Sequence, residues 1–434
     1  MTQKATGMRA LFRREPLFYA AFFCFLVLLA CFITPAPDDR LWATSYGQAL
    51  FERGFANYNG RYLGNLGAYA LLRIPWSLPL VKALTLTGIL WLTQRVTGNR
   101  DTRFLCLSAV LLLLLPGPLF IQDFAWTTAF LNYEVPVLLL LCLACLVFYA
   151  QGRAGWPIRL IAIAALGFAA QLFMEHYTLF ALAVSAYTVV RRKYRAFLPR
   201  TLVWFCSAAA GAALMFSNGN YLRALQGKKG YQRVSLDFFG GLARVAGSFA
   251  VACLPILLTM VVLLILLRRR NPAAFARIPR SPAAWRGAAL LAVLNAPLIF
   301  VFPMGPRCFS LSAALLLLMT HKLFIATVGV GKAANVGGTA DAVPWPSGMR
   351  ALAAALALVM ALDLSGYVFV REANRAKVAE VRAQAAQGNR AVVLRHTPMR
   401  FLVNALDQEP INRNILRGFL EYYELPADVT ISYK

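Results

Sequence analysis

Two adjacent carboxylates, Asp38 and Asp39, directly follow a long apolar segment, within the sequence Pro-Ala-Pro-Asp-Asp-Arg. Such a pair can serve one reaction, because one carboxylate can accept a proton from a hydroxyl group while its neighbour orients that hydroxyl or holds a cation. The prolines disfavour a continuing helix and so fix how the pair leaves the apolar segment. The alternative is that Asp-Asp-Arg is only the solvated start of a loop, and the motif alone leaves both interpretations open.

The same loop, residues 34–76, continues with polar and aromatic residues that suit a sugar or a phosphate. Residues 57–62 read Asn-Tyr-Asn-Gly-Arg-Tyr, which makes Asn57, Tyr58 and Asn59 candidates for binding sugar or acceptor. Amides and phenols hydrogen-bond hydroxyl groups, and a guanidinium clamps phosphate oxygens. The alternative is a belt of aromatic residues at headgroup depth, where tyrosine is common.

Three later segments combine the same residue types. The further candidates for binding sugar or acceptor are Asp123, Asn132, Tyr133, Glu134, Glu175 and His176. His176 has two interpretations, as a site residue or as a hydrogen-bonded residue at a helix interface. Arg307 ends an otherwise uncharged apolar segment, and a single buried guanidinium needs an anion such as a phosphate or a carboxylate. The spacing of His and Cys residues matches no zinc motif, so no metal ligands are predicted.

The elements that must position these residues are predicted to be membrane-spanning helices. Hydrophobic residues make up 59% of the 434-residue chain and charged residues only 14%, which is more apolar surface than one soluble core can bury. Apolar segments of spanning length predict about eleven helices. They lie at about 17–33, 77–94, 104–120, 133–150, 158–174, 176–190, 201–217, 245–267, 287–303, 308–330 and 350–370. The predicted fold class is an all-α polytopic membrane protein.

The charges predict an orientation. The 44 Lys and Arg residues outnumber the 18 Asp and Glu residues, but they form short clusters between apolar segments and not the aromatic-interleaved basic face expected of a nucleic-acid-binding protein. With a cytoplasmic N-terminus, 22 basic residues fall on inner loops and ten on outer loops before the tail, as the positive-inside rule expects. The acidic residues on or near the outer side are Asp38, Asp39, Glu52, Asp123, Glu134, Glu175 and Asp237. Carboxylates at membrane depth are usually functional, so the chemistry is predicted on the outer face.

The tail, residues 371–434, is polar and of mixed charge, and it predicts a small cap on the outer face. A helix is expected over about 371–387, a strand over Ala391–Leu394, and helical segments near about 398–407 and 411–424. Residues 1–370 would then form the membrane-embedded domain.

Together these features resemble the GT-C superfamily of membrane glycosyltransferases, most closely the bacterial multipass enzymes that modify surface glycans with polyprenyl-phosphate sugars. The resemblance is carried by Asp38-Asp39, Asn59-Gly60-Arg61-Tyr62, Leu131-Asn132-Tyr133, Glu175-His176-Tyr177-Thr178, Gly305-Pro306-Arg307, Asn412-Arg413-Asn414 and Tyr422-Tyr423. It implies a GT-C-like bundle of about eleven helices in the cytoplasmic (inner) membrane, with the C-terminal cap in the periplasm.

The resemblance also implies an activity. A sugar would pass, with inversion, from a polyprenyl-monophosphate donor to a surface glycan, a glycolipid or a protein such as pilin. A loop aspartate would be the catalytic base, which carries over to Asp38 or Asp39, and basic residues near the outer face would bind the donor phosphate, which carries over to Arg61, Lys82 or Arg307. No cofactor is required, although the aspartate pair could hold a divalent metal. The expected partners are the lipid-linked donor, the acceptor and membrane lipids.

Two other functions use similar components. An O-antigen-type polymerase or ligase also uses lipid-linked sugars, but its large outer loop usually comes late in the chain, whereas the acidic motif here follows the first span. A flippase or transporter of lipid-linked sugars predicts internal symmetry and broken helices near the bilayer midplane. The sequence shows neither sign, and its charged residues gather at one interface, so it favours the transferase.

Overall fold

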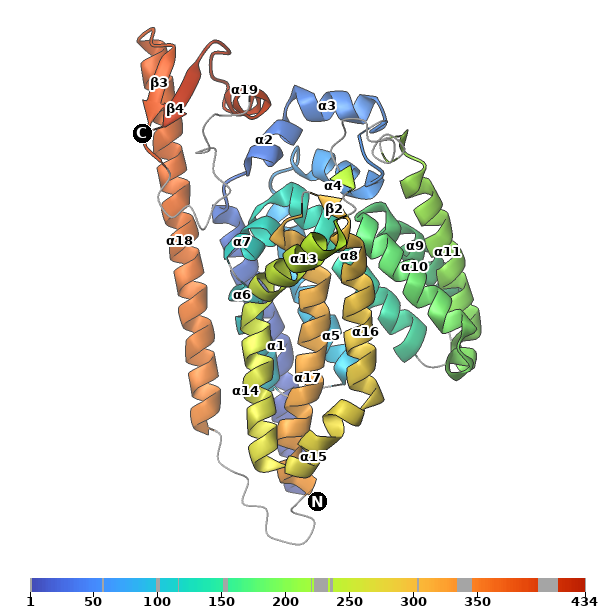
Figure 1. Ribbon diagram of the computed structural model, residues 1–434. Coiled ribbons are helices and arrows are strands. Elements are labelled where there is room, and N and C mark those ends of the chain that lie inside the picture. Colours follow the sequence, from blue (N-terminus) through green and yellow to red (C-terminus); the bar gives the residue numbers. More distant parts are fainter. Residues whose placement is uncertain are drawn as a thin grey trace.

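The computed structural model describes residues 2–56, 58–98, 102–115, 117–150, 155–219, 221, 233–234, 237–302, 304–333, 346–396 and 413–433. Over these residues the chain is mostly helical, and it is an all-α membrane protein (Figure 1). Six helical segments of the described chain are long and apolar enough to cross a membrane, or seven if one bent pair of helices is counted as a single span.

The six spans fall in six helical regions. They are Glu15–Phe32 of α1 (Thr2–Phe32), α8 (Thr127–Ala144) continued by η2 (Cys145–Tyr149), η4 (Arg192–Phe197) with α11 (Leu198–Phe216), α16 (Pro282–Asn295) with η6 (Ala296–Ile299), η7 (Pro306–Phe309) with α17 (Ser310–Ala333), and α18 (Pro346–Ala386). A continuous apolar core joins α1, α5 (Leu78–Thr97), α8 and α17. This core gives the bundle a fixed frame on which polar side chains can be held.

The predicted count of about eleven spans is not confirmed, because several predicted spans are shorter or more polar helices. The helices in question are α5, α6 (Thr102–Leu113), α7 (Gly117–Phe120), α9 (Trp156–Ala169) with η3 (Ala170–Leu172), and α10 (Glu175–Val190). Helix α5 carries Lys82, Gln94 and Arg95, which lower its mean hydropathy. Helix α6 ends ahead of Pro116, a residue type that removes a backbone donor and interrupts helices.

The predicted span at 245–267 is two helices, α13 (Phe238–Ala252) and α14 (Leu254–Arg270), bent by 76°. Pro255 lies in the first turn of α14, where proline fits a helix start but cannot continue the preceding helix. In Figure 1, α13 lies across the upper end of the bundle and α14 runs down from it towards α15 (Pro272–Arg277). The break is therefore at one end of the bundle.

The loop predicted at 34–76 contains three short helices: α2 (Pro37–Ala43), α3 (Ser45–Glu52) and α4 (Tyr62–Leu71). Helix α2 begins with Pro37 in its first turn, and the Asp39 carboxylate accepts a hydrogen bond of 3.2 Å from the Ala36 amide before it. Proline at the first position and an acidic residue at the third are typical of a helix start. Figure 1 places all three helices at the end of the bundle opposite the N-terminus.

The tail begins inside a helix, since α18 runs without a break from Pro346 to Ala386 through both the apolar and the polar segment. Strand β3 (Ala391–Leu394) lies where the sequence predicts it, and α19 (Arg413–Tyr422) falls within the predicted 411–424 segment, whereas 398–407 lies outside the described residues. The sequence did not predict β4 (Thr430–Tyr433), which pairs with β3 in parallel. A second small core joins α18, β3, α19 and β4, so the cap folds onto the end of α18.

Candidate functional site

A small pocket beside α2, α4 and α8 contains many of the candidate residues. Its lining consists of Asp38, Trp42, Tyr58, Asn59, Arg61, Asn65, Ala68, Trp126, Thr128, Ala129, Asn132, Tyr133 and Arg307. The cavity measures about 40 Å³, which is room for one or two water molecules. Seven of the fourteen predicted site residues therefore lie around one space, although they come from three distant parts of the sequence.

Asp38 and Asp39 point in different directions, as neighbouring residues on a helix must. Asp38 is partly exposed and lines the pocket, whereas Asp39 is fully buried. Burial, together with the charge of Asp39, raises the pKa of Asp38 to about 6, although Arg307 opposes this rise. Asp38 is thus a carboxylate with a pKa near neutrality, open to a cavity, which is what a general base requires.

Asp39 organises the start of α8. Its two carboxylate oxygens accept hydrogen bonds from the amides of Thr127 (2.9 Å) and Thr128 (2.8 Å), in addition to the Ala36 amide. These are first-turn amides of α8, and the residue before that helix supplies no side-chain cap of its own. Asp39 is therefore a capping carboxylate delivered from another helix, and the structure places it away from the pocket that Asp38 lines.

Lys82 is also buried beside this contact. Its Nζ atom donates hydrogen bonds to the carbonyl oxygens of Phe124 (2.6 Å) and Ala125 (2.9 Å), just before α8. Burial raises the pKa of Asp39, and the ammonium of Lys82 and the three amide donors oppose this rise. Lys82 thus hydrogen-bonds these carbonyls and interacts electrostatically with Asp39, and it does not line the pocket. The structure places it in the framework behind the pocket.

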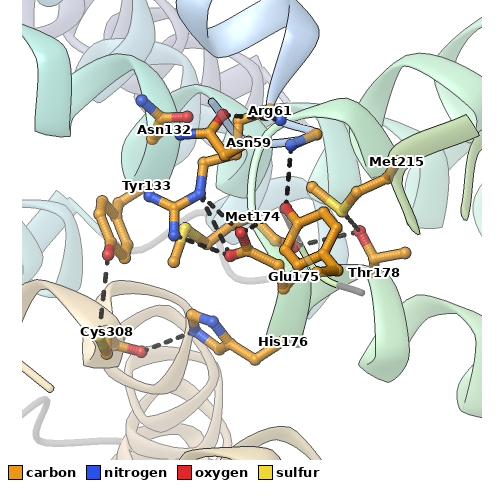
Figure 2. Close-up of polar contacts among 12 residues, drawn as sticks. Asn59, Arg61, Asn132, Tyr133, Met174, Glu175, His176, Thr178, Met215 and Cys308 are labelled. Atoms are coloured by element: carbon orange, nitrogen blue, oxygen red, sulfur yellow. Dashed lines mark hydrogen bonds and ion pairs between the residues drawn. The ribbon is translucent and has the colours of Figure 1, made fainter. Parts of the chain in front are cut away.

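Arg61 lies at the start of α4, where its guanidinium forms a bidentate ion pair with Glu175. Nε and Nη2 of Arg61 lie 2.9–3.2 Å from the carboxylate oxygens, and the hydroxyl of Tyr221 donates to the same carboxylate at 2.7 Å (Figure 2). Burial alone would lower the pKa of Arg61, but Glu175 holds it well above its usual range. The positive charge of Arg61 is thus already neutralised by a carboxylate.

The segment before Arg61 is also fixed by hydrogen bonds and by close packing. Asn59 Oδ1 accepts hydrogen bonds from the Arg61 amide (3.1 Å) and from Nδ2 of Asn65 (2.8 Å). A Cβ atom on Gly60 would lie 2.0 Å from the carbonyl oxygen of Met215, so only glycine lets this segment pass α11 at that distance. Asn57 lies outside the described residues, whereas Tyr58 packs edge-on against Trp42 with ring centroids 5.7 Å apart.

Arg307 approaches the pocket from the segment before α17. Its guanidinium lies 4.5 Å from the ring centroid of Trp126 and 5.7 Å from that of Tyr133. Its charge opposes the rise in pKa of both Asp38 and Asp123. Of the three predicted phosphate ligands, Arg61 and Arg307 line the pocket, whereas Lys82 lies behind it.

Asp123 and Glu134 are buried together behind the pocket. Ser310 donates a hydrogen bond of 2.5 Å to Asp123, and burial, with the nearby Glu134, raises the pKa of Asp123 well above its usual range. Two buried carboxyl groups that repel each other cannot both be charged at low cost, so at least one of them tends to hold a proton. Neither residue lines the pocket, so the structure places both of them in its support.

His176 is buried and its Nε2 atom lies 3.0 Å from the carbonyl oxygen of Cys308 (Figure 2), which matches the interface interpretation of this residue. A ring N–H that donates to a backbone carbonyl fixes the orientation of the imidazole. Tyr133 contacts the Cys308 thiol from the other side, with 3.8 Å between oxygen and sulfur. His176 and Tyr133 thereby connect α8, α10 and the segment that carries Arg307.

Buried polar atoms of pocket residues include two that have no hydrogen-bond partner among the described residues and belong to side chains at the start of α8. Nε1 of Trp126 is a donor, and Oδ1 of Asn132 is an acceptor in a side chain whose Nδ2 donates to the Thr128 carbonyl at 2.7 Å. Buried polar atoms are normally paired, so such an exception in a pocket indicates a group that a ligand or water would satisfy. Asn132 was predicted from the sequence as a residue that binds sugar or acceptor, whereas Trp126, three residues after Asp123, was not predicted as a site residue.

Two other residues of the site were missed. Tyr221 donates to Glu175, which lies 46 positions away, so its role depends on a long-range contact. Asn65 pairs with Asn59, six positions before it in a polar segment that had already supplied candidates. Among the described residues, no group of three or more His, Cys, Asp and Glu side chains is arranged to hold a metal. The groups that could contact a ligand are thus a carboxylate, a guanidinium, an amide and aromatic rings.

The whole chain matches no protein-family model, and no curated protein or solved structure is significantly similar to it.

Proposed function

We propose that this chain is a GT-C-type membrane glycosyltransferase that transfers a sugar from a polyprenyl-monophosphate donor to an acceptor hydroxyl. The observation that carries the proposal is the pocket in which Asp38 and Arg307 meet two unpaired buried polar atoms, at one end of an apolar helix bundle. A base, a cation and hydrogen-bonding groups for hydroxyls are what this reaction requires, and the bundle would hold the polyprenyl chain.

In the proposed reaction the Asp38 carboxylate accepts the proton of the acceptor hydroxyl. The resulting oxygen attacks the anomeric carbon from the side opposite the phosphate, a new glycosidic bond forms, and the bond between that carbon and the phosphate oxygen breaks. Arg307 stabilises the negative charge of the departing phosphate. Asn132 and Trp126 supply an acceptor and a donor for hydrogen bonds with sugar hydroxyls.

The direct test is a transfer assay with the purified full chain and a synthetic polyprenyl-phosphate sugar carrying a radioactive label. Transfer of label to an acceptor from the native host would support the proposal. If the purified chain moves the intact donor across proteoliposomes without cleaving it, it is a transporter; if it accepts only pyrophosphate-linked sugars, it is an O-antigen-type polymerase or ligase. Either result would overturn the proposed function.

Replacing Arg307 with Ala should weaken binding of the donor, while the base Asp38 is unchanged. We expect the KM for the donor to rise about tenfold or more, since a charge-assisted hydrogen bond contributes about 1.5–3 kcal/mol. Arg307→Lys should recover part of this loss, because it keeps the charge but not the planar fork. Arg244→Ala, at an exposed arginine of α13, is the matched control. An unchanged donor KM in a folded Arg307→Ala protein would contradict the assigned role.

The proposed orientation in the cytoplasmic membrane, with the N-terminus in the cytoplasm and the cap in the periplasm, predicts the activity of phosphatase fusions. An alkaline phosphatase fused after Lys434 should be active in the native host, because the enzyme matures only outside the cytoplasm. A fusion near Arg270, at the end of α14, should be inactive. Reversed activities would move the pocket to the cytoplasmic face and remove the proposed function with it.

A further inference from the structure

The cap packs directly on the helix that carries Asp38. Gly418 of α19 lies against Leu41 of α2, where a Cβ atom would approach the Leu41 Cα to 3.1 Å. The Arg40 guanidinium lies 5.2 Å from the ring centroid of Phe419 and 5.9 Å from that of Tyr423. The Glu421 carboxylate accepts hydrogen bonds from the Ser45 amide (2.7 Å) and hydroxyl (2.9 Å), at the start of α3. Helices α2, α3 and α19 are therefore joined into one unit.

A groove with a volume of about 410 Å³ remains between α3 and α19. Leu41, Ala49 and Leu50 are the apolar residues of its lining, and Thr44, Ser45, Tyr46 and Asn414 add hydroxyl and amide groups. Arg53 at the end of α3 and Arg417 in α19 complete its lining, together with Glu421. The groove is about ten times larger than the pocket beside Asp38, and Leu41 and Thr44 place it along the same helix.

The charges of the groove favour an anion. Arg53 and Arg417 are exposed, and neither forms an ion pair with a carboxylate among the described residues. Among the described residues that line the groove, Glu421 is the one carboxylate, and it accepts hydrogen bonds from Ser45. An apolar floor suits the C–H faces of sugar rings, while guanidinium, amide and hydroxyl groups suit ring hydroxyls and carboxylates.

We propose that the groove between α3 and α19 binds an acidic oligosaccharide, which is the acceptor chain whose end reaches Asp38. This inference rests on the proposed function, since it names the acceptor class for that pocket. A lipid headgroup fits less well, because α3 and α19 lie at the tip of the molecule, at the far end from the N-terminus (Figure 1). Helix α2 lies between the groove and the pocket, so a chain bound in the groove lies next to the helix that carries the base.

Binding of a defined probe to the purified full chain tests the inference without any transfer. We expect a hexamer of galacturonic acid to bind, more weakly at raised ionic strength, and the neutral glucose hexamer maltohexaose to bind much less. Arg53→Ala and Arg417→Ala should each weaken binding of the acidic hexamer about three- to tenfold. This is the effect expected when one charge-assisted hydrogen bond is lost at an exposed site. Arg395→Ala, an exposed arginine of the cap outside the groove, should leave binding unchanged.

Three results would overturn the inference: no binding of the acidic hexamer, equal binding of both hexamers, or equal weakening by Arg395→Ala. Competition by phosphatidylglycerol nanodiscs that is lost in Arg53→Ala and Arg417→Ala would show a lipid site instead. The Asp38→Asn protein should bind the acidic hexamer as tightly as the wild type. Binding of the acidic hexamer by a wild-type protein that shows no transfer activity would remove the proposed function alone, whereas wild-type transfer without probe binding would remove this inference alone.

Discussion

Transfer by the Asp38→Asn protein should be roughly 10²–10⁴-fold slower than by the wild type, the range attributed to general acid–base catalysis. Asparagine keeps the shape of the side chain at the pocket but cannot accept the proton of the acceptor hydroxyl. The loss should appear in kcat, whereas the KM for the donor should change little because Arg307 is intact. The measurement is steady-state transfer of labelled sugar by purified protein.

The pH profile separates a lost base from a damaged pocket. Burial and the charge of Asp39 raise the pKa of Asp38 to about 6, so the active carboxylate form is lost as pH falls through about 6. Wild-type transfer should therefore rise with pH through a midpoint of about 6 and level off above it, and the residual activity of Asp38→Asn should lack this step. If Asp38→Asn and Asp39→Asn both retain wild-type transfer, the proposed mechanism is wrong.

Replacing Asp39 with Ala should cost stability rather than catalysis, with a loss of about 3–5 kcal/mol in the free energy of unfolding. The substitution removes the negative charge that offsets the buried ammonium of Lys82, and it removes the acceptor for the Thr127, Thr128 and Ala36 amides. We expect a marked fall in the temperature at which the detergent-solubilised protein loses its monodisperse peak. This temperature should fall less for Asp39→Asn, since asparagine keeps one oxygen acceptor.

The control for this substitution is Asp237→Ala. Asp237 caps α13 through the Gly240 amide at 2.9 Å, but it is exposed, so its loss should cost only about 1 kcal/mol. Lys82→Met in the Asp39→Ala background should recover part of the loss, because it removes a buried positive charge that no carboxylate then offsets. Equal stability of Asp39→Ala and Asp237→Ala would contradict the framework role of Asp39.

The residue types in the pocket could be predicted from the sequence because each stands in a short polar segment beside an apolar one. Asp38, Arg61 and Asn132 could be nominated in this way, and the pocket brings all three together. The membrane class and strand β3 followed from hydropathy and from local pattern. The separate places of Asp38 and Asp39 could be expected too, since consecutive residues of one segment point in different directions.

The partners of those residues could not be predicted, because they depend on contacts far apart in the chain. Arg61 is separated from Glu175 by 114 positions, and Asp39 from Thr128 by 89. No local signal distinguishes a guanidinium that binds phosphate from one that pairs with a carboxylate. The number of spans could not be predicted for another reason. Hydropathy alone does not reveal where α6 ends or how α13 and α14 bend.

The unbroken helix α18 carries the cap at its C-terminal end. Its 41 residues extend about 60 Å at 1.5 Å per residue, about twice the roughly 30 Å thickness of the hydrocarbon layer. A continuous helix has no hinge between its apolar and its polar segment, so α18 is expected to move as one rigid helix, with β3 following its C-terminal end. If α18 crosses the bilayer, the distance from the lipid surface at which a chain can meet α19 is fixed by the length of this one helix. The protein would then act at a fixed level of the cell envelope, whatever the total length of the chain presented to it.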